Sequence, residues 1–178
     1  MKRLVMCEGA NELTLFNILL ENKALLFTED ELLGLTAYHA RQIKTNAQVR
    51  MALNMYFGND VVVMRVGDKL SDRLFIPADY KEKIFNVSKY CTLPELEMLL
   101  LISEGLVKEY EKVKSALKPK EFAKEKVYCG RKKYDNSSQF YWDYYGRDCD
   151  KLIWTIREYK RIRGSHKKNE LYLADLLK

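Results

Sequence analysis

Short apolar runs alternate with amphipathic stretches through the first half of the chain. Arg3 to Cys7 and Val61 to Val66 have the composition of buried strands, and the second is β-branched and too apolar for an exposed edge. Residues 12–22 and 46–57 repeat apolar positions at helical spacing. This alternation is typical of strands and helices that take turns around a mainly parallel sheet, so the pattern predicts an α/β fold.

Weaker signals predict the remaining elements of this half. Asn11 is expected to cap the first helix, and Gly58 is expected to end the second. Residues 24–28 are a candidate second strand, and residues 84–90 are expected to be extended. Residues 32–43 carry no pattern that assigns them securely.

The second half is predicted to be mainly helical. Pro94 fits the first turn of a long helix that runs to about Ser115, with Thr92 as its cap. Residues 149–163 form an amphipathic basic helix, and residues 169–177 are expected to form a last short helix that docks on the body. We therefore divide the chain into an α/β domain over residues 1–115 and a mainly helical, basic and aromatic-rich extension over residues 116–178.

Composition narrows the class of protein. The 178 residues suit one compact domain, and a hydrophobic content of 47% with only 8 Gly and 3 Pro excludes a disordered or collagen-like chain. No apolar run approaches the roughly 18 residues that span a bilayer, and the first residues lack the apolar core of a signal peptide. The four cysteines are too widely spaced for a CxxC metal knuckle. We expect a cytoplasmic protein with no membrane partner.

The formal charge of +6 is unevenly distributed along the chain. Residues 1–105 carry 12 basic and 14 acidic side chains, whereas residues 106–168 carry 18 basic and 9 acidic ones. A basic excess confined to one third of the chain indicates a phosphate-rich partner more strongly than the total charge does.

Basic and aromatic residues are interleaved in that third. Basic side chains neutralise phosphates and exposed rings stack on unpaired bases, so this composition favours a nucleic-acid-binding surface. The alternatives are a small core of packed rings beneath solvating lysines, and a surface for a protein partner. The candidate nucleic-acid-binding residues are Lys124, Lys126, Arg131, Lys132, Lys133, Tyr141, Trp142, Arg157, Lys160, Arg161, Lys167 and Lys168.

Acidic residues follow both predicted buried strands. Glu8 comes directly after the first strand, where Gly9 leaves room beside the carboxylate, and Asp68 and Asp72 follow the second. The carboxyl ends of parallel strands meet at one edge of a sheet, where ligands bind in open α/β folds, and carboxylate oxygens suit Mg²⁺. The alternatives are a solvated acid at a helix entry and a polar loop that caps itself.

Two further acids begin the predicted long helix. Glu95 and Glu97 lie about 200° apart on a helical wheel, so they do not share a role. One of them is explained by the helix dipole, which favours acids in a first turn. Either acid could line the crevice edge, and the sequence does not distinguish them.

Three segments of the first 105 residues resemble a known family. Leu4-Val5-Met6-Cys7-Glu8-Gly9, followed by Asn11-Glu12 and a helix, is similar to the opening motif of the Toprim domain of topoisomerases, primases and small nucleases. Val61 to Asp68 occupies the place of that family's second, metal-binding motif, and residues 94–100 resemble an element of small stand-alone proteins of the RloB type, associated with bacterial defence. The resemblance implies a Toprim-like sheet flanked by helices, with Glu8 as general acid or base and Mg²⁺, replaceable by Mn²⁺, on Asp68 and Asp72.

The chain departs from the family at the second motif. The family's Asp-x-Asp is replaced by Met64-Arg65-Val66-Gly67-Asp68, with an arginine where another acid is expected, and the acid after Glu-Gly is Glu12. The resemblance implies a Mg²⁺-dependent nucleic-acid phosphodiesterase in bacterial defence or nucleic-acid processing, with Glu12, Glu95 and Glu97 as further crevice acids. The alternative is a non-catalytic module that binds nucleic acid or protein and has kept the fold but lost the full metal site.

Overall fold

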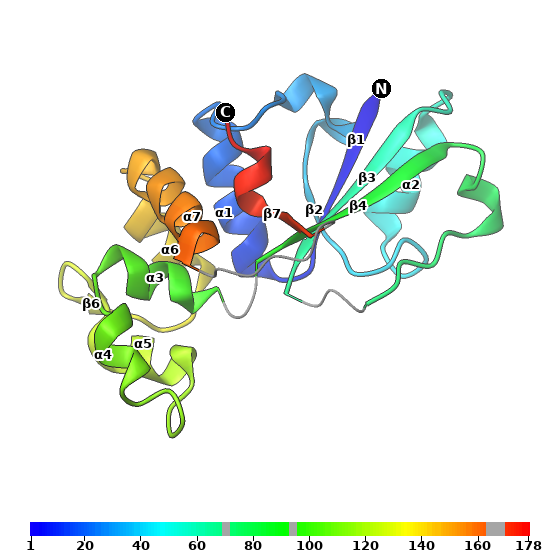
Figure 1. Cartoon of the computed structure of the whole chain (residues 1–178). Helices are drawn as coiled ribbons and strands as arrows, with labels where there is room; N and C mark the ends of the chain where they lie inside the picture. Colours follow the sequence, from blue (N-terminus) through cyan, green and yellow to red (C-terminus); the bar gives the residue numbers. More distant parts are fainter. Residues whose placement is uncertain (69–71, 93–95, 163–169) are drawn as a thin grey trace.

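A computed structural model describes residues 1–68, 72–92, 96–162 and 170–178 (Figure 1). Helices and strands alternate in its first half, and helices dominate the second. The strands are β1 (Lys2–Cys7), β2 (Tyr38–His39), β3 (Val61–Gly67), β4 (Ile84–Cys91), β5 (Tyr128–Cys129), β6 (Lys132–Lys133) and β7 (Leu171–Tyr172). The α-helices are α1 (Ala10–Glu21), α2 (Ala47–Met55), α3 (Glu97–Ser103), α4 (Val107–Glu111), α5 (Pro119–Lys126), α6 (Ser138–Tyr145) and α7 (Cys149–Ile162), and the short 3₁₀ helices are η1 (Glu29–Glu31), η2 (Leu33–Leu35), η3 (Ala78–Tyr80) and η4 (Leu173–Leu176).

A five-stranded, all-parallel sheet lies at the centre, in the order β2-β1-β3-β4-β7. The predicted α/β fold with a mainly parallel sheet is confirmed, and so are the strands predicted at residues 3–7, 61–66 and 84–90. β1 and β3 pair in register from Lys2↔Val61 to Cys7↔Val66. Because β1 lies between β2 and β3, the connections on its two sides diverge, and a crevice is expected at the carboxyl ends of these strands.

Alternate side chains of β1 face two separate cores. Leu4 and Met6 pack on the side of α2, whereas Val5 and Cys7 pack with α1 and with helices of the second half. This period of two, with both faces buried, explains why the strand reads as a nearly continuous apolar run. The sheet is therefore covered on both faces at β1, and polar side chains gather at its carboxyl edge.

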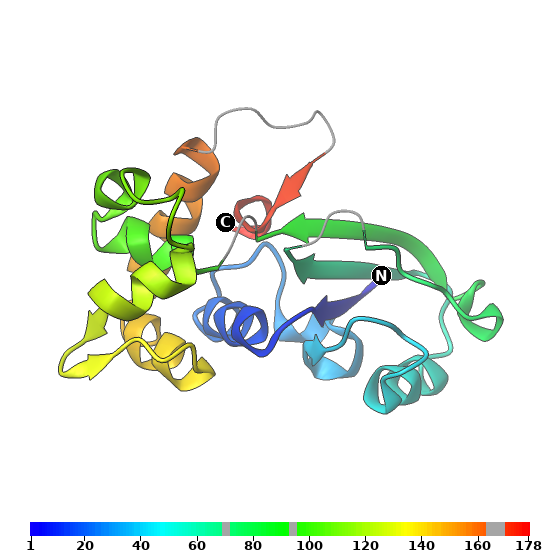
Figure 2. The ribbon, with the colours of Figure 1, turned by 90° about the horizontal axis from the view of Figure 1, so that it is seen from below.

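The second half of the chain packs onto the first. α6 packs against α1 and α7 against α3, and Figure 1 shows α6 and α7 beside α1. β7 extends the sheet by pairing Leu171 with Tyr90 and Tyr172 with Cys91, so the end of the chain lies next to β4 (Figure 2). The helix predicted at residues 149–163 is present as α7. In the part of the chain that the structure describes, no helix is long and apolar enough to cross a membrane.

Two predicted elements differ in the structure. Residues 24–28 form no strand of the sheet: Leu25 makes one antiparallel bridge with Leu177, and β2 lies instead in the segment that carried no clear pattern. The long helix predicted from Pro94 to Ser115 is broken, because α3 ends at Ser103 and Gly105 adopts a left-handed conformation at φ +68° before α4. Pro94 itself lies outside the described residues.

The predicted helix ends also need correction. Gly9, not Asn11, is the N-cap of α1, and the amide of Asn11 donates instead to Asn136. α2 begins at its cap Asn46 as the pattern implies, but it ends at Met55, three residues before Gly58. The last predicted helix is a short strand, β7, followed by the 3₁₀ helix η4, because the chain here pairs with the sheet edge.

Candidate active site

Glu8 lies where β1 and β3 end. Its backbone N–H donates to the carbonyl of Val66 at 2.8 Å, which extends the pairing of the strands by one residue. Its side chain is 8% exposed and lies against Gly67, where a Cβ atom would come within 2.4 Å of Glu8 Oε2. Gly67 therefore makes room for this carboxylate, whereas Gly9 makes room for Glu12, whose Oε2 would lie 2.3 Å from a Cβ at Gly9.

Glu12 lies within electrostatic reach of three other carboxylates at this edge. Burial raises the pKa of Glu12, in the first turn of α1, and the negative charges of Asp68, Glu8 and Glu97 raise it further, against a lowering by a backbone hydrogen bond. These are acids that the sequence marked, and they come from β1, α1, the end of β3 and α3. Their mutual repulsion makes the edge a favourable place for a cation.

Glu97 is a buried acid with a side-chain hydrogen-bond donor. It is 8% exposed, and the hydroxyl of Tyr134 donates to its Oε1 at 2.9 Å. Burial and the charge of Glu97 both raise the pKa of Tyr134, so this hydroxyl stays protonated and able to donate. Tyr134 also shares a hydrogen bond of 3.0 Å with the hydroxyl of Tyr141. A residue from the second half of the chain thus orients an acid at the sheet edge.

The expected ligand Asp72 is engaged elsewhere. Its carboxylate forms an ion pair with Arg65 at 2.8 Å, and Arg65 also donates to the backbone carbonyl of Asp72 at 2.7 Å. Arg65 is 5% exposed, so its buried charge depends on Asp72 as a partner. The role of Asp72 as a metal ligand stays a prediction. Over the described residues, no three His, Cys, Asp or Glu side chains are placed to hold one metal ion together. Glu95 lies outside the described residues.

A cationic group lies on the α2 side of Glu8, and the sequence reasoning missed it. Arg65 and Lys89 are paired in register on β3 and β4, and Arg41 follows β2, with its Nε 3.7 Å from Glu8 Oε1. Burial lowers the pKa of Lys89, the charge of Arg65 lowers it further, and the charges of Glu8 and Asp72 oppose this. The sequence signal that could have predicted this group is a basic residue near the end of each of two neighbouring strands, Arg65 in β3 and Lys89 in β4.

Three polar atoms at this edge are buried without a hydrogen-bond partner in the described structure: Glu8 Oε2, Lys89 Nζ and Thr92 Oγ1. Thr92 therefore does not cap a helix as predicted. Folded proteins seldom leave such atoms unpaired, because each costs the free energy of its lost hydration. Among the described residues, the carboxyl edge thus leaves three polar atoms without a protein partner.

The candidate nucleic-acid-binding residues of the second half have mixed surroundings. Tyr141 is fully buried, so its ring is not available to stack on a base and its assignment is corrected; Trp142 is 39% exposed. Arg131 and Lys133 are exposed on the β5–β6 hairpin. Acidic side chains form ion pairs with five of the candidates: Lys124, Lys126, Lys132, Lys160 and Arg161. Arg157 donates a hydrogen bond to the backbone carbonyl of Lys178. Lys167 and Lys168 lie outside the described residues.

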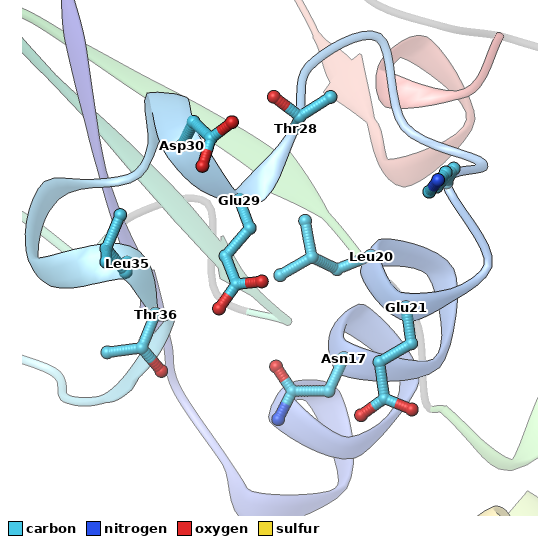
Figure 3. Close-up of a pocket in the computed structure, with 9 residues that line it drawn as sticks. Asn17, Leu20, Glu21, Thr28, Glu29, Asp30, Leu35 and Thr36 are labelled. Carbon is cyan, nitrogen blue, oxygen red and sulfur yellow. The ribbon is translucent and has the colours of Figure 1, made fainter.

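A cavity of about 480 Å³ opens away from these acids, between the end of α1 and the 3₁₀ helices η1 and η2. Figure 3 shows the carboxylate of Glu29 between Leu20 and Thr36, with Asn17 below it. No residue that the sequence marked for chemistry lines this cavity. It is therefore separate from the candidate active site.

Fold and site together define an α/β protein with a mixed-charge crevice at the carboxyl edge of a parallel sheet: carboxylates toward α1 and α3, cations toward α2. No protein-family model, curated protein or solved structure matches this chain.

Proposed function

We propose that this protein is a Mg²⁺-dependent nucleic-acid phosphodiesterase with its active site at the carboxyl edge of the sheet, in a Toprim-like domain. The observation that carries the proposal is the buried, unpartnered Oε2 of Glu8, which lies within electrostatic reach of Glu12. The donors are hard carboxylate oxygens, which fit Mg²⁺. Mg²⁺ commonly uses one or two carboxylates and completes its shell with water and substrate phosphate, so Asp68 and Glu12 suffice as its protein ligands.

The chain's own residues would divide the reaction as follows. Oε2 of Glu8 accepts a proton from water as the water oxygen bonds to phosphorus and the P–O ester bond breaks; solvent protonates the leaving oxygen. Tyr134 keeps Glu97 oriented at the edge. The bound metal would polarise the phosphate and lower the pKa of the attacking water. Arg131, Lys133 and Trp142 offer exposed positions that hold the strand. A role in bacterial defence or nucleic-acid processing is part of the same proposal.

Cleavage of single-stranded and duplex DNA and RNA, with Mg²⁺ or Mn²⁺, tests this function. Glu8→Gln keeps the shape of the side chain but removes the proton acceptor, so we expect a loss of about 100-fold or more in rate. Glu111→Gln, an exposed acid of α4, is the matched control and should cleave like the wild type. Cleavage that survives Glu8→Gln would refute the assignment.

A second candidate is a non-catalytic nucleic-acid-binding module. The ion pair between Arg65 and Asp72 favours it, because it engages one of the two acids expected to bind metal. This candidate predicts nucleic-acid binding that weakens steeply with salt, together with no heat of Mg²⁺ or Mn²⁺ binding. Calorimetry on the wild-type protein separates the two functions.

A further inference from the structure

The cations around Glu8 come from β3, from β4 and from the segment that follows β2. Arg41 follows β2, Arg65 belongs to β3 and Lys89 to β4, and Glu8 and Gly67 lie between them at the ends of β1 and β3. Arg65 and Lys89 line one small cavity together with Glu8 and Gly67. Three positive charges therefore surround one carboxylate, on the side of the sheet opposite Glu12.

Two members of this group each have one buried atom without a hydrogen-bond partner in the described residues. The two atoms are Lys89 Nζ and Glu8 Oε2. A buried ammonium and a buried carboxylate each lose strong hydration, and direct pairing would offset that loss. In the described residues the two atoms do not pair with each other, although Glu8 and Lys89 line the same small cavity.

From this arrangement we infer a phosphate-binding subsite formed by Lys89 and Arg41 beside Glu8. The inference rests on the proposed function and deepens it: the ligand is a phosphate group, either free or part of a nucleic-acid backbone. The phosphate oxygens would accept hydrogen bonds from Lys89 and Arg41. Hydrogen bonds between a cationic donor and an anionic oxygen are stronger than those to a neutral acceptor.

Arg65 supplies charge to this subsite but not a contact. Its guanidinium already donates to the carboxylate and the backbone carbonyl of Asp72. The cavity is too small to enclose a phosphate group, so the ligand would lie over its mouth. Arg41 is exposed there, with 65% of its side chain accessible. Lys89 Nζ is buried, so its ammonium group would turn outward on its flexible stem to reach the ligand.

Binding of inorganic phosphate in metal-free buffer, followed by ³¹P NMR or calorimetry, tests the subsite without requiring cleavage. We expect Lys89→Met and Arg41→Met each to weaken binding by about tenfold or more, because each removes a charged donor. Lys81→Met and Arg50→Met remove exposed cations of the same half and should change binding less than about twofold. If Lys89→Met folds poorly, Lys89→Arg provides the test instead: it keeps the charge and should retain phosphate binding.

A second arm compares a trinucleotide carrying a 5′-phosphate with the same trinucleotide without it. Weakening of both trinucleotides by Lys89→Met assigns the subsite to the backbone, whereas weakening confined to inorganic phosphate assigns it to the free anion. Absence of saturable phosphate binding by the wild type, or equal binding by Lys89→Met, would overturn the inference. If the wild type binds phosphate and Lys89→Met does not, but the wild type does not cleave nucleic acid, the proposed function is refuted and the subsite stands.

Discussion

At the carboxyl edge of the sheet, several polar atoms of the described residues are buried without a hydrogen-bond partner, whereas in α6 the hydroxyls of buried tyrosines are hydrogen-bonded. Tyr141 shares a hydrogen bond with Tyr134, and Tyr145 shares one of 2.9 Å with Ser103. Glu8 Oε2 and Lys89 Nζ have none among the described residues. Both regions carry residues that the sequence marked for function, but only the first is left incomplete by folding.

The difference shows how to separate structural from functional residues. A buried hydroxyl that is fully hydrogen-bonded stabilises the fold, because breaking its bond costs free energy. A buried charge without a partner destabilises the fold, so its presence is better explained by a ligand that completes it. On this criterion the buried tyrosines of α6 belong to the scaffold, and the sheet edge is the better candidate for the proposed chemistry.

The largest expected effect distinguishes neighbouring rings of α6. Tyr141→Ala removes a fully buried ring and should lower the free energy of unfolding by about 3–5 kcal/mol. Trp142→Ala removes a ring that is 39% exposed and should cost less than about 1 kcal/mol. Denaturant unfolding of both variants measures the two values, and similar losses would contradict the scaffold role assigned to Tyr141.

A smaller effect of opposite sign is expected at the sheet edge. The pKa of Glu12 is raised above its ordinary value of 4.5, so the ionised side chain destabilises the folded state. Below its unfolded pKa, Glu12 is protonated and favours the folded state most. This contribution to the free energy of unfolding is lost as the pH rises through its folded pKa. Glu12→Gln should therefore stabilise the metal-free protein at neutral pH, by roughly 0.5–2 kcal/mol.

Thermal unfolding across pH measures this gain. The difference between Glu12→Gln and the wild type should shrink as the pH falls below about 4.5, where Glu12 is protonated in both states. Glu21→Gln, an exposed position at the end of the same helix, should show no comparable pH-dependent gain. A Glu12→Gln protein that is less stable at neutral pH would show that the carboxylate is satisfied, contrary to the account of the edge.

The smallest effect concerns the exposed cations of the hairpin. Replacing Arg131 and Lys133 together with methionine should lower the slope of log Kd against log salt for nucleic-acid binding by about 2. Lys124→Met, whose charge is paired with Glu121 at 3.4 Å, should change the slope less. Equal slopes for wild type and the double variant would place the nucleic-acid surface elsewhere.

Much of this architecture was predictable from local pattern. Val61 to Val66 is β-branched and apolar enough to identify a buried strand, and parallel topology then brings Glu8 and Asp68 to one edge. Ring exposure was not predictable, because Tyr141 and Trp142 are adjacent in sequence and only the packing of α6 on α1 separates their environments. The partner of Asp72 was also hidden, since it depends on where the loop after β3 returns.

The central claim is that the carboxylates of the sheet edge bind a divalent cation. Calorimetric titration of Mn²⁺ into the full-length protein tests it most directly, with Asp68→Asn and the exposed control Glu111→Gln alongside. We predict saturable binding by the wild type and by Glu111→Gln, weakened about tenfold or more by Asp68→Asn. Absence of saturable Mn²⁺ binding by the wild type, or equal affinity in Asp68→Asn, would contradict the account.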